Sequence, residues 1–261
     1  MGENIKVLIT VKTYPLPSVK YKELVCTAGV FEDGTFIRLY PIDYRYRPYW
    51  QWYSKYQWIE LEVEKNTEDP RPESFRPVDG AKIAPLGEPL STDNNWAERK
   101  KYVLAKGVQT MCCLNKLKQN ECSLGIVRLR EVKDFKIEQA KRNWKPEWQN
   151  LLDQQELFGP KRKPLEKIPY DFSYVFLCDE PKCPGHSKKV EDWEIGKLYL
   201  KMWDKYHSEK IAVQKVKEKF LDEICSPNKD THFFVGTVLR FGSWIILGAF
   251  YPSKEDPRLR F

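Results

Sequence analysis

The segment Phe31-Glu32-Asp33-Gly34-Thr35-Phe36 decides the fold of the N-terminal part of the chain. It places an Asp-Gly turn between two apolar runs, which is the strongest short-range signal for a β-hairpin. Residues 57–64 then alternate strictly, with Ile, Leu and Val on one face and Trp and Glu on the other. Such alternation is typical of a strand with one buried face. We therefore predict a curled antiparallel sheet or barrel in residues 1–85.

The C-terminal third carries a different pattern. Apolar runs predict strands at residues 172–178, 231–238 and 243–251. Apolar positions with the 3.6-residue spacing of amphipathic helices occupy residues 193–206 and 209–224. We therefore predict, for residues 164–261, a small antiparallel sheet with two helices on one face.

The middle of the chain, residues 86–163, is predicted to be a basic helical segment with short strands. Its predicted elements are helices at 94–106 (capped by Asp93), 108–119 and 146–157, strands at 125–129 and 132–138, and a linker at 159–163. The three ranges together predict an α+β chain of three parts.

Charge and composition narrow the functional classes. The formal net charge is +7, and residues 81–165 carry 17 Lys and Arg against 10 Asp and Glu, whereas the flanking segments are close to neutral. A local basic excess beside aromatic rings suits binding to nucleic acid, although a solvated lysine-rich surface is the alternative. The longest apolar run, 243–251, is too short to cross a bilayer. Seven cysteines, an odd number, and no apolar leader after Met1 predict a cytoplasmic protein.

A dense aromatic segment at residues 44–56 interleaves rings with two arginines and a lysine. Arginines and aromatic faces together bind single strands with little sequence preference. The same rings could instead fill the core or anchor a protein partner. The nucleic-acid interpretation leaves DNA and RNA both open. It predicts binding residues in this segment, in the proline-rich loop 69–77 and in the basic middle of the chain. These residues are Arg45, Arg47, Trp50, Trp52, Lys55, Arg71, Arg76, Arg99, Lys100, Arg142 and Trp144.

The segment 178–194 gathers the residues with the richest chemistry. Cys178-x4-Cys183-x2-His186 has the residue types and spacing of three zinc ligands on a knuckle between a strand and a turn. The fourth ligand is left open among Cys225, His207, His232 and water. The alternative is a buried cysteine at a strand end, an incidental second cysteine and a surface histidine.

His186, Asp192 and Glu194 also raise the alternative of a metal-dependent nuclease or nucleotide hydrolase. Asp192, however, directly precedes the amphipathic helix predicted at 193–206, which is the place of an N-cap. A third alternative is a non-catalytic subunit of a larger effector complex, whose rings contact protein. The sequence therefore predicts a nucleic-acid-binding protein and leaves open whether it breaks a bond.

Several short motifs extend over nearly the whole chain: Lys-Thr-Tyr-Pro at 12–15, Cys-Thr-Ala-Gly at 26–29, Arg-Leu-Tyr-Pro at 38–41, Asp-Pro-Arg-Pro-Glu-Ser at 69–74, residues 96–101 and residues 178–194. In these motifs the chain resembles a family of uncharacterised prokaryotic proteins of similar length. The resemblance implies a free-standing cytoplasmic protein of a prokaryote, and the predicted nucleic-acid binding would suit a component of a defence or nucleic-acid-processing system. It implies no activity and transfers no catalytic residue.

Overall fold

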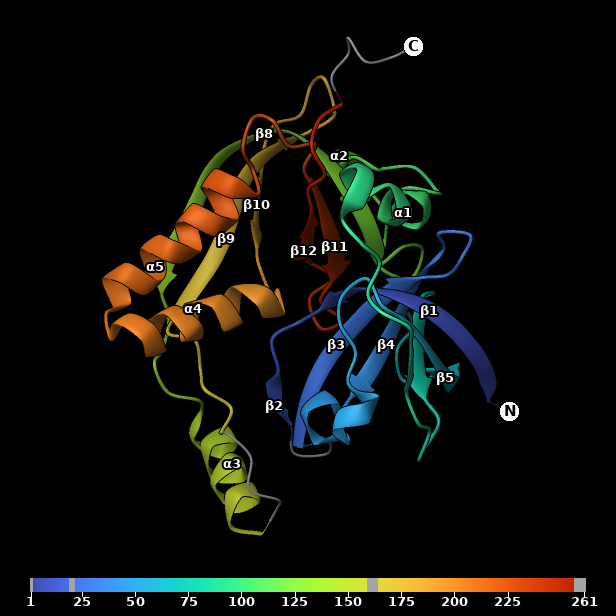
Figure 1. Cartoon of the computed structure of the whole chain (residues 1–261), viewed down its shortest axis with the longest axis vertical. Coiled ribbons are helices and arrows are strands. Elements are labelled where there is room, and N and C mark those ends of the chain that lie inside the picture. The colour runs from blue at the N-terminus through green and yellow to red at the C-terminus, as the bar shows by residue number, and fades with distance from the viewer. Residues whose placement is uncertain (1, 19–21, 159–163, 256–261) are drawn as a thin grey trace.

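The computed structural model describes residues 2–18, 22–158 and 164–255, which form an α+β protein with two sheets (Figure 1). The N-terminal sheet contains seven strands: β1 (Glu3–Lys12), β2 (Leu16–Ser18), β3 (Lys22–Val30), β4 (Phe36–Ile42), β5 (Trp58–Lys65), β6 (Ser74–Pro77) and β7 (Ala84–Leu86). Its main order is β1-β3-β4-β6-β5, and β5 also pairs with β1, so that five strands close into a barrel. The predicted N-terminal sheet or barrel is confirmed.

Local sequence explains this barrel. The Asp-Gly hairpin joins β3 to β4, with Gly34 at a φ of 82° and the Thr35 amide donating to Asp33 Oδ1 at 2.9 Å. A residue with a Cβ would be strained at that positive φ. In β5 the Ile, Leu and Val side chains at 59, 61 and 63 are buried, as the alternation predicts. The aromatic segment that follows β4 forms two short 3-10 turns, η1 (Tyr44–Tyr46) and η2 (Tyr49–Gln51).

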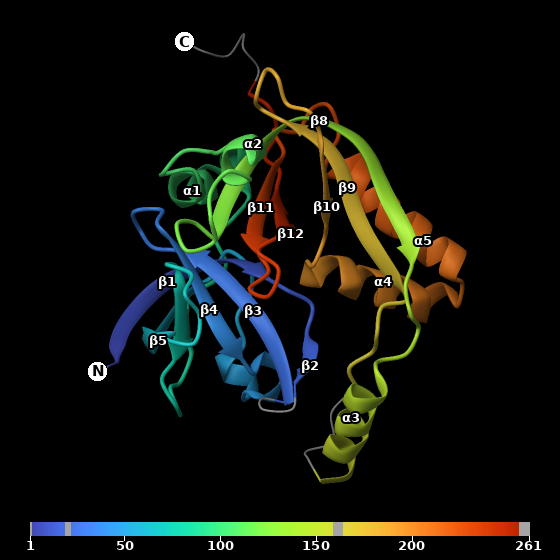
Figure 2. The same cartoon turned by 180° about the vertical axis from the view of Figure 1, so that it is seen from behind.

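The C-terminal sheet is antiparallel, in the order β10-β9-β8-β11-β12. Its strands are β8 (Leu124–Gln139), β9 (Tyr170–Cys178), β10 (His186–Lys189), β11 (His232–Thr237) and β12 (Trp244–Phe250). Helices α4 (Trp193–Tyr206) and α5 (Glu209–Lys217) lie on one side of this sheet (Figures 1 and 2). Phe176, Phe233 and Val216 are fully buried between these layers. The predicted sheet with two helices is confirmed.

The middle of the chain differs most from its prediction. It contains α1 (Asp93–Val103), α2 (Met111–Leu114) and α3 (Pro146–Phe158). The helix expected at 108–119 is reduced to α2, because Gln109 pairs in extended form with the backbone of Ile126 and keeps the helix from starting earlier. Asp93 does not cap α1, since the residue before the helix is Thr92, and the three residues after Asp93, Asn94 to Trp96, have left-handed backbone with φ of 49°, 55° and 63°.

The two strands expected at 125–129 and 132–138 are a single strand, β8. Its pairing with β9 shifts register twice, near Glu131 and near Lys133, and these irregularities break the alternation that a sequence reading relies on. Helix α3 projects away from the C-terminal sheet and lies beside β2 and β3 of the N-terminal sheet (Figures 1 and 2). The linker predicted at 159–163 lies outside the described residues. No helix in the described part of the chain is both long and apolar enough to span a bilayer.

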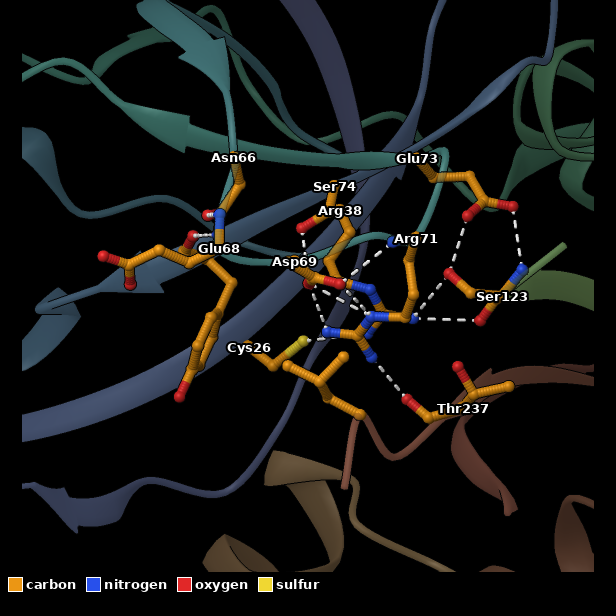
Figure 3. Close-up of polar contacts among 12 residues, drawn as sticks. Cys26, Arg38, Asn66, Glu68, Asp69, Arg71, Glu73, Ser74, Ser123 and Thr237 are labelled. Carbon is orange, nitrogen blue, oxygen red and sulfur yellow. Dashed lines mark hydrogen bonds and ion pairs between the residues drawn. The ribbon is translucent and has the colours of Figure 1, made fainter. Parts of the chain in front are cut away.

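A buried polar cluster joins the barrel to the C-terminal sheet (Figure 3). Asp69 accepts hydrogen bonds from Arg71 Nε at 2.8 Å and from Ser74 Oγ at 2.7 Å. Arg71 Nη1 in turn donates to the backbone oxygen of Thr237, in β11, at 2.6 Å. The carboxylate therefore neutralises an arginine that reaches across to the other sheet.

A second arginine crosses the same boundary. Arg38 Nη2, from β4, donates to the backbone oxygen of Ser123 at 2.9 Å, and the Ser123 amide and hydroxyl donate to Glu73 at 2.9 and 2.6 Å (Figure 3). We call the set Arg38, Asp69, Arg71, Glu73, Ser74, Ser123 and Thr237 the polar junction. Arg71, one of the residues predicted to bind nucleic acid, is only 5% exposed, and its hydrogen bond to Thr237 links the two sheets.

Candidate functional site

Three cysteines and one histidine meet at one end of the C-terminal sheet. Cys178 ends β9, His186 begins β10 and Cys183 lies in the turn between them. The fourth member, Cys112, comes from α2. Their four ligand atoms all lie within 4.8 Å of one another, so the cluster could hold a metal ion.

The spacing within this cluster matches a tetrahedral site. Cys178 Sγ lies 3.6 Å from Cys112 Sγ and 3.5 Å from Cys183 Sγ. His186 Nε2 lies 3.3 to 3.5 Å from the three sulfurs. Ordinary Zn–S and Zn–N bond lengths in a tetrahedron require about 3.8 Å between sulfurs and about 3.6 Å from sulfur to nitrogen. On the other side of the ring, His186 Nδ1 lies 3.4 Å from the Asn115 side-chain amide nitrogen.

The structure brings the three sequence-predicted ligands together and adds one that the sequence analysis missed. The residues named for the fourth position lie elsewhere: Cys225 Sγ contacts the Phe220 carbonyl, His232 Nδ1 contacts the Asp230 carbonyl, and His207 is the C-cap of α4. Cys112 precedes Cys178 by 66 residues and carries no paired-cysteine spacing of its own. Only the packing of α2 against the knuckle reveals it.

Two adjoining pockets lie where the barrel meets α4, and they share Trp193 and Lys197. The larger, of about 710 Å³, we call the α4 pocket; the smaller, of about 470 Å³, we call the Lys12 pocket. Rings and cations make up most of the Lys12 pocket lining, whereas the α4 pocket is also lined by prolines, leucines and the carboxylates Glu166 and Asp204. The α4 pocket includes Tyr14, Arg45, Trp52 and Lys201, and the Lys12 pocket includes Lys12, Lys55, Tyr56, Trp96 and Arg99.

One face of α4 forms a wall of these pockets. Trp193, Lys197 and Lys201 follow one another at four-residue intervals and so share a face of the helix. Asp192 caps this helix, because its Oδ1 accepts from the Glu194 amide at 2.9 Å, which confirms the predicted cap. The Thr13–Asp192 backbone bridge places the start of α4 directly against the end of β1.

The two carboxylates considered for catalysis bind a lysine of the barrel. Lys55 Nζ lies 3.1 Å from Asp192 Oδ2 and 2.9 Å from Glu194 Oε2. Burial raises the pKa of Asp192 to about 6, whereas the two carboxylates raise the pKa of Lys55 above its usual value against the effect of its own burial. His186 belongs to the cysteine cluster, so the structure does not bring it together with Asp192 and Glu194.

Most of the predicted nucleic-acid contacts form ion pairs or ring contacts within the protein. Arg45 pairs with Glu23, Arg47 with Asp43, Arg76 with Glu64, Lys100 with Glu255 and Arg142 with Glu209, while Arg99 lies over the rings of Tyr56 and Trp96, and Trp144 packs on Trp148. Trp50 is 59% exposed and Trp52 36%. Of the predicted set, Arg45, Trp52, Lys55 and Arg99 line the two pockets, and the role of the whole set in binding stays a prediction.

Comparison with known proteins identifies the family of this chain but assigns it no activity. Two family models match, a domain of unknown function (DUF8758) over residues 3–105 and a domain of unknown function (DUF8757) over residues 107–261. No curated protein matches. A solved structure titled "Structure of murine DNA binding protein bound with ds DNA" is 8% identical over 98% of both chains, with a TM-score of 0.33. A likeness that weak supports no conclusion about this chain.

Proposed function

The chain belongs to the family of the domain of unknown function DUF8757, and since that family brings no activity with it, we propose from the geometry that this protein binds single-stranded nucleic acid along the two pockets beside α4. One observation carries the proposal. The α4 pocket and the Lys12 pocket adjoin at Trp193 and Lys197, and each lining includes at least three aromatic rings and three cations. Rings stack on unpaired bases, and cations contact the phosphates between them.

The dimensions and exposure of the α4 pocket suit this ligand. About 710 Å³ is within the usual range for a small-molecule site and so offers room for a nucleotide unit. Lys197 and Lys201 are exposed on the helix face that lines it, and Trp52, also in the lining, has 36% of its surface exposed. Lys55 and Arg71 are buried in ion pairs, so the proposed surface does not depend on them.

We expect the Lys197→Ala/Lys201→Ala double variant to bind a labelled single-stranded oligonucleotide more weakly and with less salt dependence. Each lost phosphate contact lowers the slope of log K against log salt by about 0.7 for single strands, so two lost contacts lower it by about 1.4. Fluorescence anisotropy over a salt series, with DNA and RNA probes, measures both effects. Lys210→Ala, an exposed lysine of α5 outside both pockets, is the matched control and leaves the slope unchanged.

We expect Trp52→Ala to weaken the same binding by about 1–3 kcal/mol, which is the loss of one stacked base. The effect appears as a change in Kd with an unchanged salt slope, because the ring carries no charge. If neither set of variants alters binding, the pockets are not the site. If the unmodified protein binds no nucleic acid at low salt, that result favours the alternative of a protein partner. The exposed rings of Tyr49 and Trp50 are then the first surface to test.

For the cysteine cluster, we propose zinc bound as a structural ion. Three thiolates and one imidazole are a soft donor set that suits tetrahedral Zn²⁺. Four protein ligands leave no open position for water or substrate, whereas hydrolytic zinc keeps one. The proposed site therefore favours a stabilising role and gives no support to a hydrolase centred on His186.

A further inference from the structure

The charges around the Lys12 pocket do not balance. Its lining contains one carboxylate and four cations, which are Glu194, Lys12, Lys55, Arg99 and Lys197. Lys55 is paired with Glu194 and with Asp192, the cap of α4. Among the residues that the structure describes, no carboxylate lies within ion-pair distance of the other three cations. Even with Asp192 counted, the pocket therefore keeps an excess of two positive charges.

Lys12, at the end of β1, is a partly buried cation without a counter-ion. Its Nζ donates to the Tyr53 carbonyl at 2.8 Å and to the Tyr44 hydroxyl oxygen at 3.3 Å, and it lies 4.4 Å from the centre of the Tyr44 ring. Burial lowers the pKa of Lys12 to about 8, so the ammonium form still prevails at neutral pH. These neutral partners stabilise the ammonium but do not cancel its charge. Since an ammonium has three N–H donors, one remains for a ligand in the pocket.

Arg99 is held in a fixed orientation by rings and by one backbone segment. Its Cζ lies 4.0 Å from the centre of the Tyr56 ring and 4.8 Å from that of Trp96. Arg99 Nε donates to the Leu90 carbonyl at 2.7 Å, and the Leu90 amide donates to the Tyr56 carbonyl at 2.7 Å. Within the described ranges, the two terminal nitrogens of Arg99 make no hydrogen bond. Their N–H groups form the planar fork that binds two oxygens of one phosphate.

We infer that the Lys12 pocket binds a phosphate monoester, the group found at a phosphorylated end of a single strand. The inference rests on the proposed nucleic-acid binding and names its substrate class, strands with a terminal phosphate. A phosphate inside a strand carries one negative charge, whereas a monoester carries about 1.5 to 2 at pH 7. The monoester thus matches the charge excess of the pocket. Arg99 binds two of its oxygens, and Lys12 and Lys197 contact the others.

The two pockets also suit the rest of such a strand. The Lys12 pocket, of about 470 Å³, adjoins the α4 pocket at Trp193 and Lys197. A strand whose terminal phosphate lies in the Lys12 pocket therefore continues along α4. Because a strand has a direction, only one of its two ends fits the Lys12 pocket in this arrangement.

The experiment compares three single strands of one sequence, each labelled on an internal base, by fluorescence anisotropy with the full chain at pH 7. One carries a 5′-phosphate, one a 3′-phosphate and one no terminal phosphate. We expect one of the two phosphorylated strands to bind roughly 10- to 100-fold more tightly than the unphosphorylated strand, which is the effect of one charge-assisted hydrogen bond. The other phosphorylated strand gains little.

The ratio of the two affinities is then measured within each variant, so that a general loss of binding cancels. Arg99→Lys keeps the charge without the fork, and Lys12→Gln removes the charge; both lose most of the preference for the phosphorylated end. Arg240→Lys changes an exposed arginine outside both pockets and keeps the preference.

Equal affinities of the three strands overturn the inference and leave the proposed function standing. Equal gains from both phosphorylated ends also overturn it, because they show only a general attraction of added charge. If no strand binds, the proposed function fails as well. A nucleoside monophosphate, added as competitor, tests the free nucleotide as the source of the same group. If it displaces the phosphorylated strand at a concentration close to that strand's own Kd, the strand end is overturned as the ligand.

Discussion

Cys112→Ser is expected to reduce bound zinc from about one ion per chain to near zero and to unfold the C-terminal sheet at a much lower temperature. Structural zinc contributes about 10–16 kcal/mol to the folding of zinc-finger peptides at neutral pH. In this chain the cysteine cluster lies at the end of a sheet with its own apolar core, so part of the structure is independent of the metal. The cost is nevertheless expected to exceed that of any other single change discussed here.

The measurement is the metal content of the purified protein by mass spectrometry, together with thermal unfolding with and without a chelator. Cys113→Ser is a closely matched control, because Cys113 is the next residue, is exposed and lies outside the cluster. It should bind zinc and unfold like the unmodified protein. Equal zinc in both variants would show that Cys112 is not a ligand.

Asp69→Ala is expected to destabilise the protein by about 3–5 kcal/mol, the usual cost of removing one partner of a buried ion pair. Asp69 is 4% exposed and accepts from both Arg71 and Ser74. Without it the Arg71 guanidinium remains buried at the polar junction with its carboxylate partner gone. For a chain of this size, the loss corresponds to a fall in Tm of roughly 6–20 °C.

Glu64→Ala provides the contrast. It breaks the Glu64–Arg76 pair, formed by an arginine of the same proline-rich loop, but both side chains are more than one third exposed. Exposed pairs contribute about 0–1 kcal/mol, so the Tm should change little. The two variants are compared by thermal unfolding, followed by circular dichroism. A similar, small fall in Tm in both variants would contradict the conclusion that the polar junction stabilises the protein.

How much the sequence could predict depends on the range of the interactions involved. The Asp-Gly hairpin, the alternation of β5 and the cap of α4 are set by residues close in sequence, and all three are confirmed. Cys112 could not be assigned, since its partners come from a knuckle 66 or more residues away. The division into domains at residues 85 and 163 stays a prediction.

Whether the arginines and aromatic rings are buried or exposed was also hard to predict, because it too depends on their contacts in the folded protein. A ring-rich segment looks the same in sequence whether it covers a surface or fills a core, and here Tyr53 and Tyr56 are buried whereas Tyr49 and Trp50 are exposed. Likewise, three prolines predict a stiff loop at 69–77 but not that Arg71 turns inward. That depends on Asp69, two residues earlier, and on the Thr237 carbonyl of the other sheet.

The separation of the cysteine cluster along the chain also sets an order of events during synthesis. Cys112 leaves the ribosome 74 residues before His186. At about 5–20 residues per second, this thiol waits roughly 4–15 s for its last partner. In that interval the barrel, complete by Leu86, has time to form, whereas the C-terminal sheet lacks its later strands. The nascent protein is thus a folded barrel followed by a thiol-bearing segment that cannot close until the knuckle has emerged.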